Sequence, residues 1–126
     1  MLKVLQNENP SLFSNAVDAE LSYLRKISAS DNLLFAYRNL GAFEALLHII
    51  KCGEGGIPVY QAVGSVSTAF TGQAGIINRL RIMRQLGMLD EKSGKKKSQV
   101  CLAPTEKLLQ EIVPILCDRY RGEFLK

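Results

Sequence analysis

The stretch of residues 71–102 constrains the fold of this chain more than any other part of the sequence. Thr71 is suited to cap a helix that continues to Leu86, and Gly87 is suited to end it. Residues 88–92 and 99–102 then have the composition of two short strands, separated by the turn sequence SGKKKS. The sequence therefore predicts a helix followed directly by a β-hairpin with a basic tip.

Positive charge is concentrated in the same stretch. Residues 71–100 contain seven basic and two acidic side chains, a net charge of about +5, whereas the whole chain has +4 and its other residues sum to about −1. A basic helix beside a basic loop forms an electrostatic surface that suits a polyanion, and nucleic acid is the first candidate.

Composition argues against several other classes of protein. With 126 residues, 47% of them hydrophobic and 22% charged, the chain is expected to form one domain with a hydrophobic core. It has no apolar run of the about 18 residues that a membrane helix needs, and its N-terminus does not resemble a secretory signal. Three widely spaced cysteines and one histidine form no metal-binding motif, and there is no phosphate loop or Ser-His-Asp set. We therefore expect a cytoplasmic protein that is not an enzyme and has no metal or cofactor.

A long amphipathic helix is expected near the N-terminus. Asn9 and Pro10 form a helix start, because Asn caps well and Pro suits the first helical position. Apolar residues then recur every three or four positions over roughly 18 residues, which is typical of one helix face. These residues are Phe13, Val17, Leu21, Leu24 and Ile27.

Three further helices complete the expected order of elements. A second helix is expected over 33–51, with Gly41 inside it, and a third over about 58–66, after a short strand at Ile57. The last helix begins after residues 104–105. Pro114 predicts a kink or a break in this last helix, because proline removes a backbone donor.

This order of elements resembles a winged helix-turn-helix domain and, within that group, the MarR family of bacterial regulators. Residues 87–89 (GML) are similar to the family's turn into the wing, and residues 100–105 (VCLAPT) are similar to its return from the wing. The resemblance covers about residues 33–110. It implies a mainly α fold with a small β-hairpin, and a single winged-helix domain over 1–126. In that domain residues 1–30 would be an N-terminal dimerisation helix, 31–104 the winged-helix core and 105–126 a C-terminal dimerisation helix.

The tip of the hairpin departs from the family pattern. The family's wing usually carries an Asp-x-Arg pair, whereas residues 94–98 (GKKKS) contain no arginine. We therefore expect this wing to contact phosphates by charge rather than to insert an arginine into the minor groove.

The helix-turn-helix resemblance assigns roles to individual side chains. The second helix of such a motif lies in the major groove with its N-terminal residues against base edges. Gln73 and Asn78 are the expected base readers, because their amides can form two hydrogen bonds with adenine. Gly72 would let the DNA backbone come close, and Thr71 would cap the helix beside a phosphate. The expected phosphate contacts are Arg79, Arg81, Arg84, Lys95, Lys96 and Lys97.

Each of these assignments has a structural alternative. The lysine run could be a solvated turn, and Arg81 and Arg84 could form surface ion pairs that contribute little. Thr71 fits a plain helix cap better than a base reader.

Other notable residues are expected to be structural. His48 fits a packed or half-exposed histidine, with a pH or ligand switch as the alternative. The cysteines are expected to be small core residues, with a redox sensor at Cys52 or Cys117 as the alternative. The expected core aromatics are Tyr37, Phe43 and Phe70.

Two hypotheses for the function follow. The first is sequence-specific binding of double-stranded DNA by a homodimeric transcriptional regulator, with helix 71–86 in the major groove and wing 92–98 on the backbone. A two-fold axis would place the two recognition helices about 34 Å apart. The alternative is a winged-helix protein–protein interaction module that docks an acidic partner. The fold also allows a small-molecule effector between the dimerisation helices and the DNA-binding lobe, although the sequence identifies none.

Overall fold

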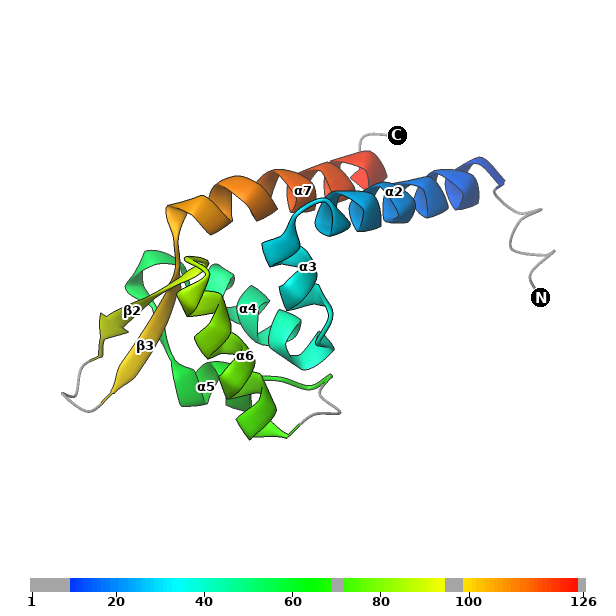
Figure 1. The fold of residues 1–126 in the computed structure, drawn as a ribbon. Coiled ribbons are helices and arrows are strands. Elements are labelled where there is room, and N and C mark those ends of the chain that lie inside the picture. The colour runs from blue at the N-terminus through cyan, green and yellow to red at the C-terminus, as the bar shows by residue number, and fades with distance from the viewer. Residues whose placement is uncertain (1–9, 69–71, 95–98, 125–126) are drawn as a thin grey trace.

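The protein is mainly helical with a small antiparallel sheet, which confirms the expected fold class (Figure 1). The computed structural model describes residues 10–68, 72–94 and 99–124. Its elements, in chain order, are α2 (Pro10–Ser28), α3 (Asp31–Tyr37), α4 (Leu40–Cys52), the 3-10 turn η1 (Gly53–Gly55), β1 (Ile57–Pro58), α5 (Val59–Gly64), α6 (Gln73–Gln85), β2 (Leu89–Ser93), β3 (Val100–Pro104) and α7 (Glu106–Phe124).

The sheet joins the predicted hairpin to the short strand at Ile57. Its strand order is β1-β3-β2, and both pairings are antiparallel. In β3, Leu102 lies opposite Ile57 of β1 on one side and Glu91 of β2 on the other. A helix, a short strand, two more helices and a hairpin in this order form the winged-helix arrangement expected from the sequence.

A single hydrophobic core holds α6 against the other helices. The inner side of α6 contributes Ile76, Leu80 and Met83, each no more than 1% exposed. They belong to the same core cluster as Leu46 and Ile49 of α4. Since full burial of such a side chain is worth about 1.5–3 kcal/mol, this face fixes the orientation of α6.

The end of α6 follows the predicted stop at Gly87. Gly87 has a φ of 80°, a conformation that favours glycine, and its N–H donates to the Arg84 carbonyl at 3.1 Å. The N–H of Met88 donates to the Met83 carbonyl at 2.9 Å, which completes the hydrogen-bond pattern of a Schellman motif. The chain then turns inward, so that Met88 and Leu89 are both buried.

The helix expected over 33–51 is in fact two helices, so that prediction is wrong. The chain bends by 112° between α3 and the segment that begins at Leu40. The side chain of Asn39 caps α4 by accepting a hydrogen bond from the Ala42 N–H at 2.9 Å. Gly41 consequently lies in the first turn of α4, where it is buried, and not in the middle of a long helix.

Of the kink or break expected in the last helix at Pro114, the break is absent, because α7 runs without interruption from Glu106 to Phe124. Pro114 is exposed, whereas Ile112 two residues earlier is buried in the core. In Figure 1, α7 and α2 lie side by side and extend beyond the rest of the fold. Packing of this arm therefore continues past the proline.

The expected aromatic core is confirmed in part. Phe43 is buried and the ring of the half-buried Tyr37 meets it edge-on, with centroids 5.1 Å apart, whereas Phe70 lies outside the described residues. Of the cysteines only Cys101 is buried. Cys52, the last residue of α4, and Cys117, on the solvent side of α7, are exposed, so the core prediction is wrong for these two.

Candidate nucleic-acid interface

The side of α6 opposite the core is open to solvent. We call Gln73, Ala74, Asn78 and Arg81 the outer face of α6, and all four are exposed. Ala74, Asn78 and Arg81 lie opposite the buried residues at helical spacing, and Gln73, the first residue of the helix, is exposed at its end. The two expected base readers, Gln73 and Asn78, are therefore both accessible to solvent.

The first turn of α6 differs from the prediction in its cap. The helix begins at Gln73 with Gly72 as the N-cap residue, whereas Thr71, the expected cap, lies outside the described residues. Gly72 has a φ of −63°, which other residues adopt readily, and a Cβ added there would meet no atom of the described residues within 4 Å. The described part of the fold therefore does not require glycine at this position.

One carboxylate holds the loop that leads into α6. Glu44 of α4 accepts hydrogen bonds from the backbone N–H groups of Ser67 and Thr68, each at 3.0 Å, and from the Thr68 hydroxyl at 2.7 Å. His48, one helical turn along α4, contacts the same carboxylate at 3.0 Å. Glu44 therefore connects the turn of the helix-turn-helix to the core helix.

The same contacts change the acidity of Glu44. The hydrogen bond from the Thr68 hydroxyl, followed by that from His48, lowers the pKa of the Glu44 carboxyl from 4.5 to about 2. His48 is half-exposed and paired with Glu44, as expected for a structural histidine. Sequence analysis missed Glu44: its spacing from His48 is visible, but its contacts with residues 23 and 24 positions later are not.

Arg79 points toward the body of the protein rather than toward the outer face. Its guanidinium lies over the ring of Phe35 in α3, 4.8 Å from the centroid, and its Nη1 donates to the Phe35 carbonyl at 3.4 Å. Such a cation–π contact contributes roughly 0.5–1 kcal/mol at a partly exposed site. The structure thus gives Arg79 a packing role between α6 and α3, and the phosphate contact expected for it is not supported.

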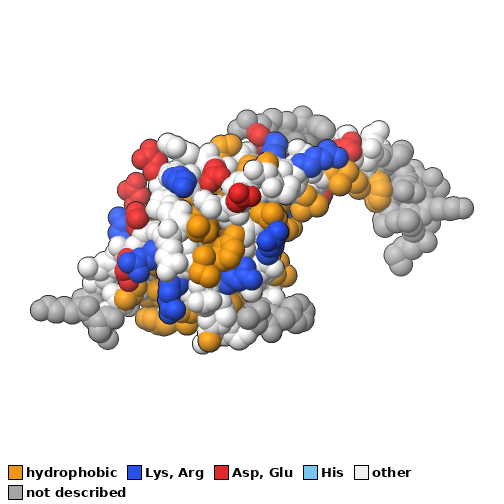
Figure 2. Space-filling view, in the orientation of Figure 1, with side chains coloured by type: hydrophobic (Ala, Val, Ile, Leu, Met, Phe, Trp, Pro, Cys, Tyr) orange, Lys and Arg blue, Asp and Glu red, His pale blue; other side chains and the backbone are white. Residues whose placement is uncertain are grey.

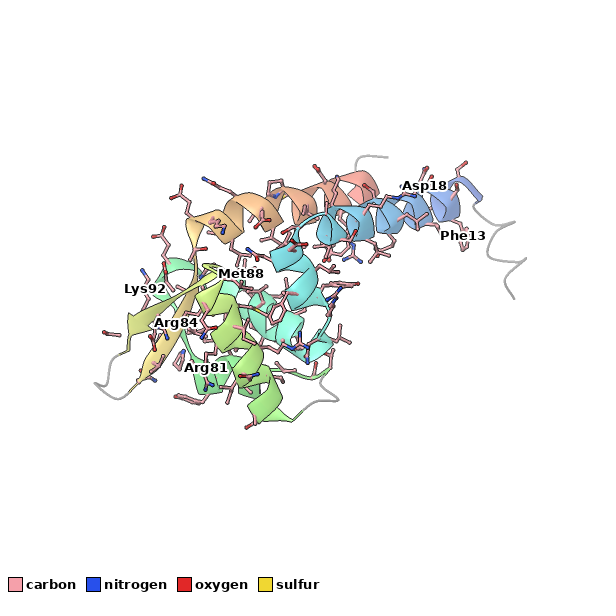
Figure 3. All side chains as sticks on the ribbon, in the orientation of Figure 1. Phe13, Asp18, Arg81, Arg84, Met88 and Lys92 are labelled. Atoms are coloured by element: carbon pink, nitrogen blue, oxygen red, sulfur yellow. The ribbon has the colours of Figure 1, made fainter. Side chains whose placement is uncertain are left out.

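Arg81 and Arg84 lie on the side of α6 that faces the hairpin, and Lys92 lies on β2 (Figure 3). Arg84 forms an ion pair with Glu91 of β2 at 2.8 Å, which agrees with the structural alternative considered for it. Arg81 is exposed and forms no ion pair with any residue in the described part of the chain.

Figure 2 shows basic side chains over α6 and the hairpin, with acidic side chains among them. Arg81, Arg84 and Lys92 are all exposed there. The run from Lys95 to Lys97, expected to extend this charge, lies outside the described residues.

The arm exposes an apolar stripe on α2. Phe13, Val17, Leu21 and Leu24, which we call the α2 stripe, are between 37% and 44% exposed. Figure 3 shows Phe13 and Asp18 projecting from opposite sides of the helix. The last apolar residue of the pattern, Ile27, is 1% exposed and belongs to the core cluster. The α2 stripe therefore remains available for a further contact.

Neither a metal cluster nor a membrane span emerges from the described residues. They contain no group of three His, Cys, Asp or Glu side chains that could hold a metal ion. None of their helices taken singly is long and apolar enough to cross a bilayer.

Comparison with protein-family models, with curated proteins and with solved structures finds no match to this chain. Function must therefore be argued from the geometry of α6, the hairpin and the arm.

Proposed function

We propose that this protein binds double-stranded DNA in a sequence-specific manner, as a homodimeric transcriptional regulator of the winged-helix type, similar to the MarR family. The observation that carries the proposal is the outer face of α6, which is uncovered and combines the amides of Gln73 and Asn78 with the charge of Arg81. In a helix-turn-helix protein this surface enters the major groove.

The distribution of charge supports the same proposal. Arg81 of α6 and Lys92 of β2 are both exposed, on the helix and the hairpin that would lie against the phosphate backbone when α6 occupies the major groove. The lysines of the hairpin tip would add contacts to the neighbouring backbone. Phosphate contacts of this kind supply affinity, and the amides of Gln73 and Asn78 supply the choice of sequence.

A second copy of the chain is the partner proposed for the arm. Isolated apolar side chains at a surface are common, but four at helical spacing on one protruding helix form a continuous patch. Pairing of two arms about a two-fold axis would cover the patch and direct two α6 helices to successive turns of the duplex.

Selection of bound sequences from random duplex DNA, followed by anisotropy titrations at several salt concentrations, tests the proposal. Asn78→Ala should lower affinity for the selected duplex by about 1–3 kcal/mol and relax the choice of one base pair. Arg81→Gln should weaken binding to all sequences and reduce the salt slope by about 0.9 for each phosphate that the protein no longer neutralises. Lys107→Gln, which removes an exposed charge from α7, is the matched control and should change neither.

A folded protein that binds no duplex at about 50 mM salt would contradict the proposal, because phosphate contacts are strong at low salt. That result would favour the alternative, a winged-helix interaction module in which the same basic surface docks an acidic protein.

A further inference from the structure

The first turn of α6 has few restraints of its own. Gly72, its N-cap residue, makes no side-chain cap hydrogen bond, and Gly75 lies within the turn. Glycine at these places lets a first turn fray more easily, because its backbone has the most freedom to lose. None of residues 73–75 is buried, and the first core contact is made by Ile76. Gln73 therefore lies ahead of the part of α6 that the core anchors.

The chain just before this turn is held by Glu44. Both of its carboxylate oxygens accept from the Ser67 N–H at 3.0 Å, and Oε1 also accepts from the Thr68 N–H at 3.0 Å and from its hydroxyl at 2.7 Å. Glu44 belongs to α4, in which the nearby Leu46 is fully buried, so the core fixes the carboxylate. The four positions from Thr68 to Gly72 span at most about 14 Å. The place of Thr68 therefore limits where α6 can begin.

We propose that Glu44 is a positioning residue for the first turn of α6 and, through that turn, for the amide of Gln73. Asn78, by contrast, lies between the buried Ile76 and Leu80 along the helix, so the core alone holds it. Loss of the carboxylate should disturb base reading by Gln73 and leave base reading by Asn78 intact. The part about base reading rests on the DNA-binding function proposed above, whereas the part about the helix does not.

Three substitutions separate positioning from stability. Glu44→Gln keeps the size of the side chain but removes the charge and replaces one acceptor oxygen with a donor group. Thr68→Val removes the hydroxyl that donates to Glu44 and leaves the Thr68 N–H in place. Ile112→Val is the matched control, because it lowers stability by removing one buried CH₂ group on α7 without changing these contacts.

Amide hydrogen exchange followed by nuclear magnetic resonance tests the helix without DNA. The N–H groups of Gly75 and Ile76 donate to the Gly72 carbonyl at 3.0 and 3.3 Å. Their exchange rates therefore report how often the first turn opens locally, independently of unfolding of the whole chain.

Glu44→Gln should raise both exchange rates about tenfold, as loss of a hydrogen bond to a charged group implies. Thr68→Val should raise them less, and adding it to Glu44→Gln should have little further effect, because both changes break the same contact. Ile112→Val should leave the two rates unchanged. Wild-type rates in folded Glu44→Gln, or an equal rise in Ile112→Val, would overturn the proposal.

Selection of bound sequences from random duplex DNA tests base reading. Gln73→Ala and Asn78→Ala first identify the base pair that each amide reads. Glu44→Gln should lower the preference at the Gln73 base pair about fivefold or more, and keep that at the Asn78 base pair within about twofold. Ile112→Val should change neither preference.

An equal loss of preference at both base pairs, or no loss at the Gln73 base pair, would contradict a positioning role for Glu44. A wild-type chain that binds no duplex would instead refute the proposed function, and the exchange rates of Gly75 and Ile76 would then decide the role of Glu44.

Discussion

Truncation of one leucine in the α2 stripe should weaken dimerisation by a predictable amount. Leu21→Ala removes three carbon atoms from a residue that is 42% exposed in the single chain. At about 0.8 kcal/mol for each buried CH₂ group, the contact that a second copy could bury is worth about 1 kcal/mol per protomer. A two-fold interface contains the change twice, so the dimer should lose about 2 kcal/mol, or roughly 30-fold in its dissociation constant.

Sedimentation velocity over a range of protein concentrations measures this constant, and far-ultraviolet circular dichroism at the same concentrations shows whether the helices are retained. Leu40→Ala is the matched control, since Leu40 is 53% exposed but lies on α4, outside the arm. The reasoning is refuted if the wild-type chain remains monomeric, or if Leu21→Ala and Leu40→Ala shift the constant equally. A loss of duplex affinity in Leu21→Ala that higher protein concentration restores would tie dimerisation to DNA binding.

Three further changes test other parts of the fold. Glu44→Gln should lower the free energy of unfolding at neutral pH. The difference from wild type should shrink as pH falls from about 4.5 to 2, because the Glu44 carboxyl has a lower pKa in the folded protein and its stabilisation is lost on protonation. Urea unfolding across this pH range measures the difference, and the variant Glu54→Gln, at an exposed carboxyl, should keep the wild-type pH dependence. Gly72→Ala should leave the melting temperature nearly unchanged, since its Cβ meets open space, but should weaken duplex binding if the DNA backbone lies against this residue; unaltered affinity would exclude that close approach. Pro114→Ala should stabilise α7 by about 1–3 kcal/mol, because the proline is exposed within a continuous helix; a calorimetric melting temperature at or below that of wild type would contradict this.

Local signals in the sequence predicted the elements that carry the candidate site. The glycine at position 87 predicted the end of α6, and its positive φ agrees with that role. The apolar spacing of α6 predicted which of its residues are buried. The same spacing placed Asn78 on the side away from the core, and the structure shows both Gln73 and Asn78 exposed. These features depend on residues within one or two helical turns, which is why a single sequence is sufficient for them.

Features that depend on distant contacts were missed or misplaced. The capping strength of Asn39 was visible in the sequence, but a continuous apolar stripe across 33–51 concealed the bend between α3 and α4. The partner of Arg79 is 44 residues away in Phe35, and nothing in the helix pattern separates such an arginine from one that faces solvent. Likewise, Glu44 reaches Ser67 only because α4 and the loop before α6 are brought together by the core.

The two arginines with partners suggest how the proposed interface divides affinity from sequence choice. Arg79 fixes one side of α6 to α3, and Arg84 fixes the other side to Glu91 of β2, so both restrain the angle at which α6 is presented. Their charges are then less available to phosphates, and Arg81 is the arginine of α6 that remains for the backbone. If the protein binds DNA as proposed, most of its salt dependence must therefore come from the hairpin lysines, while α6 supplies the choice of sequence. Substitutions in the hairpin and at Arg81 should change affinity for all duplexes, and substitutions at Gln73 and Asn78 should change which duplex is preferred.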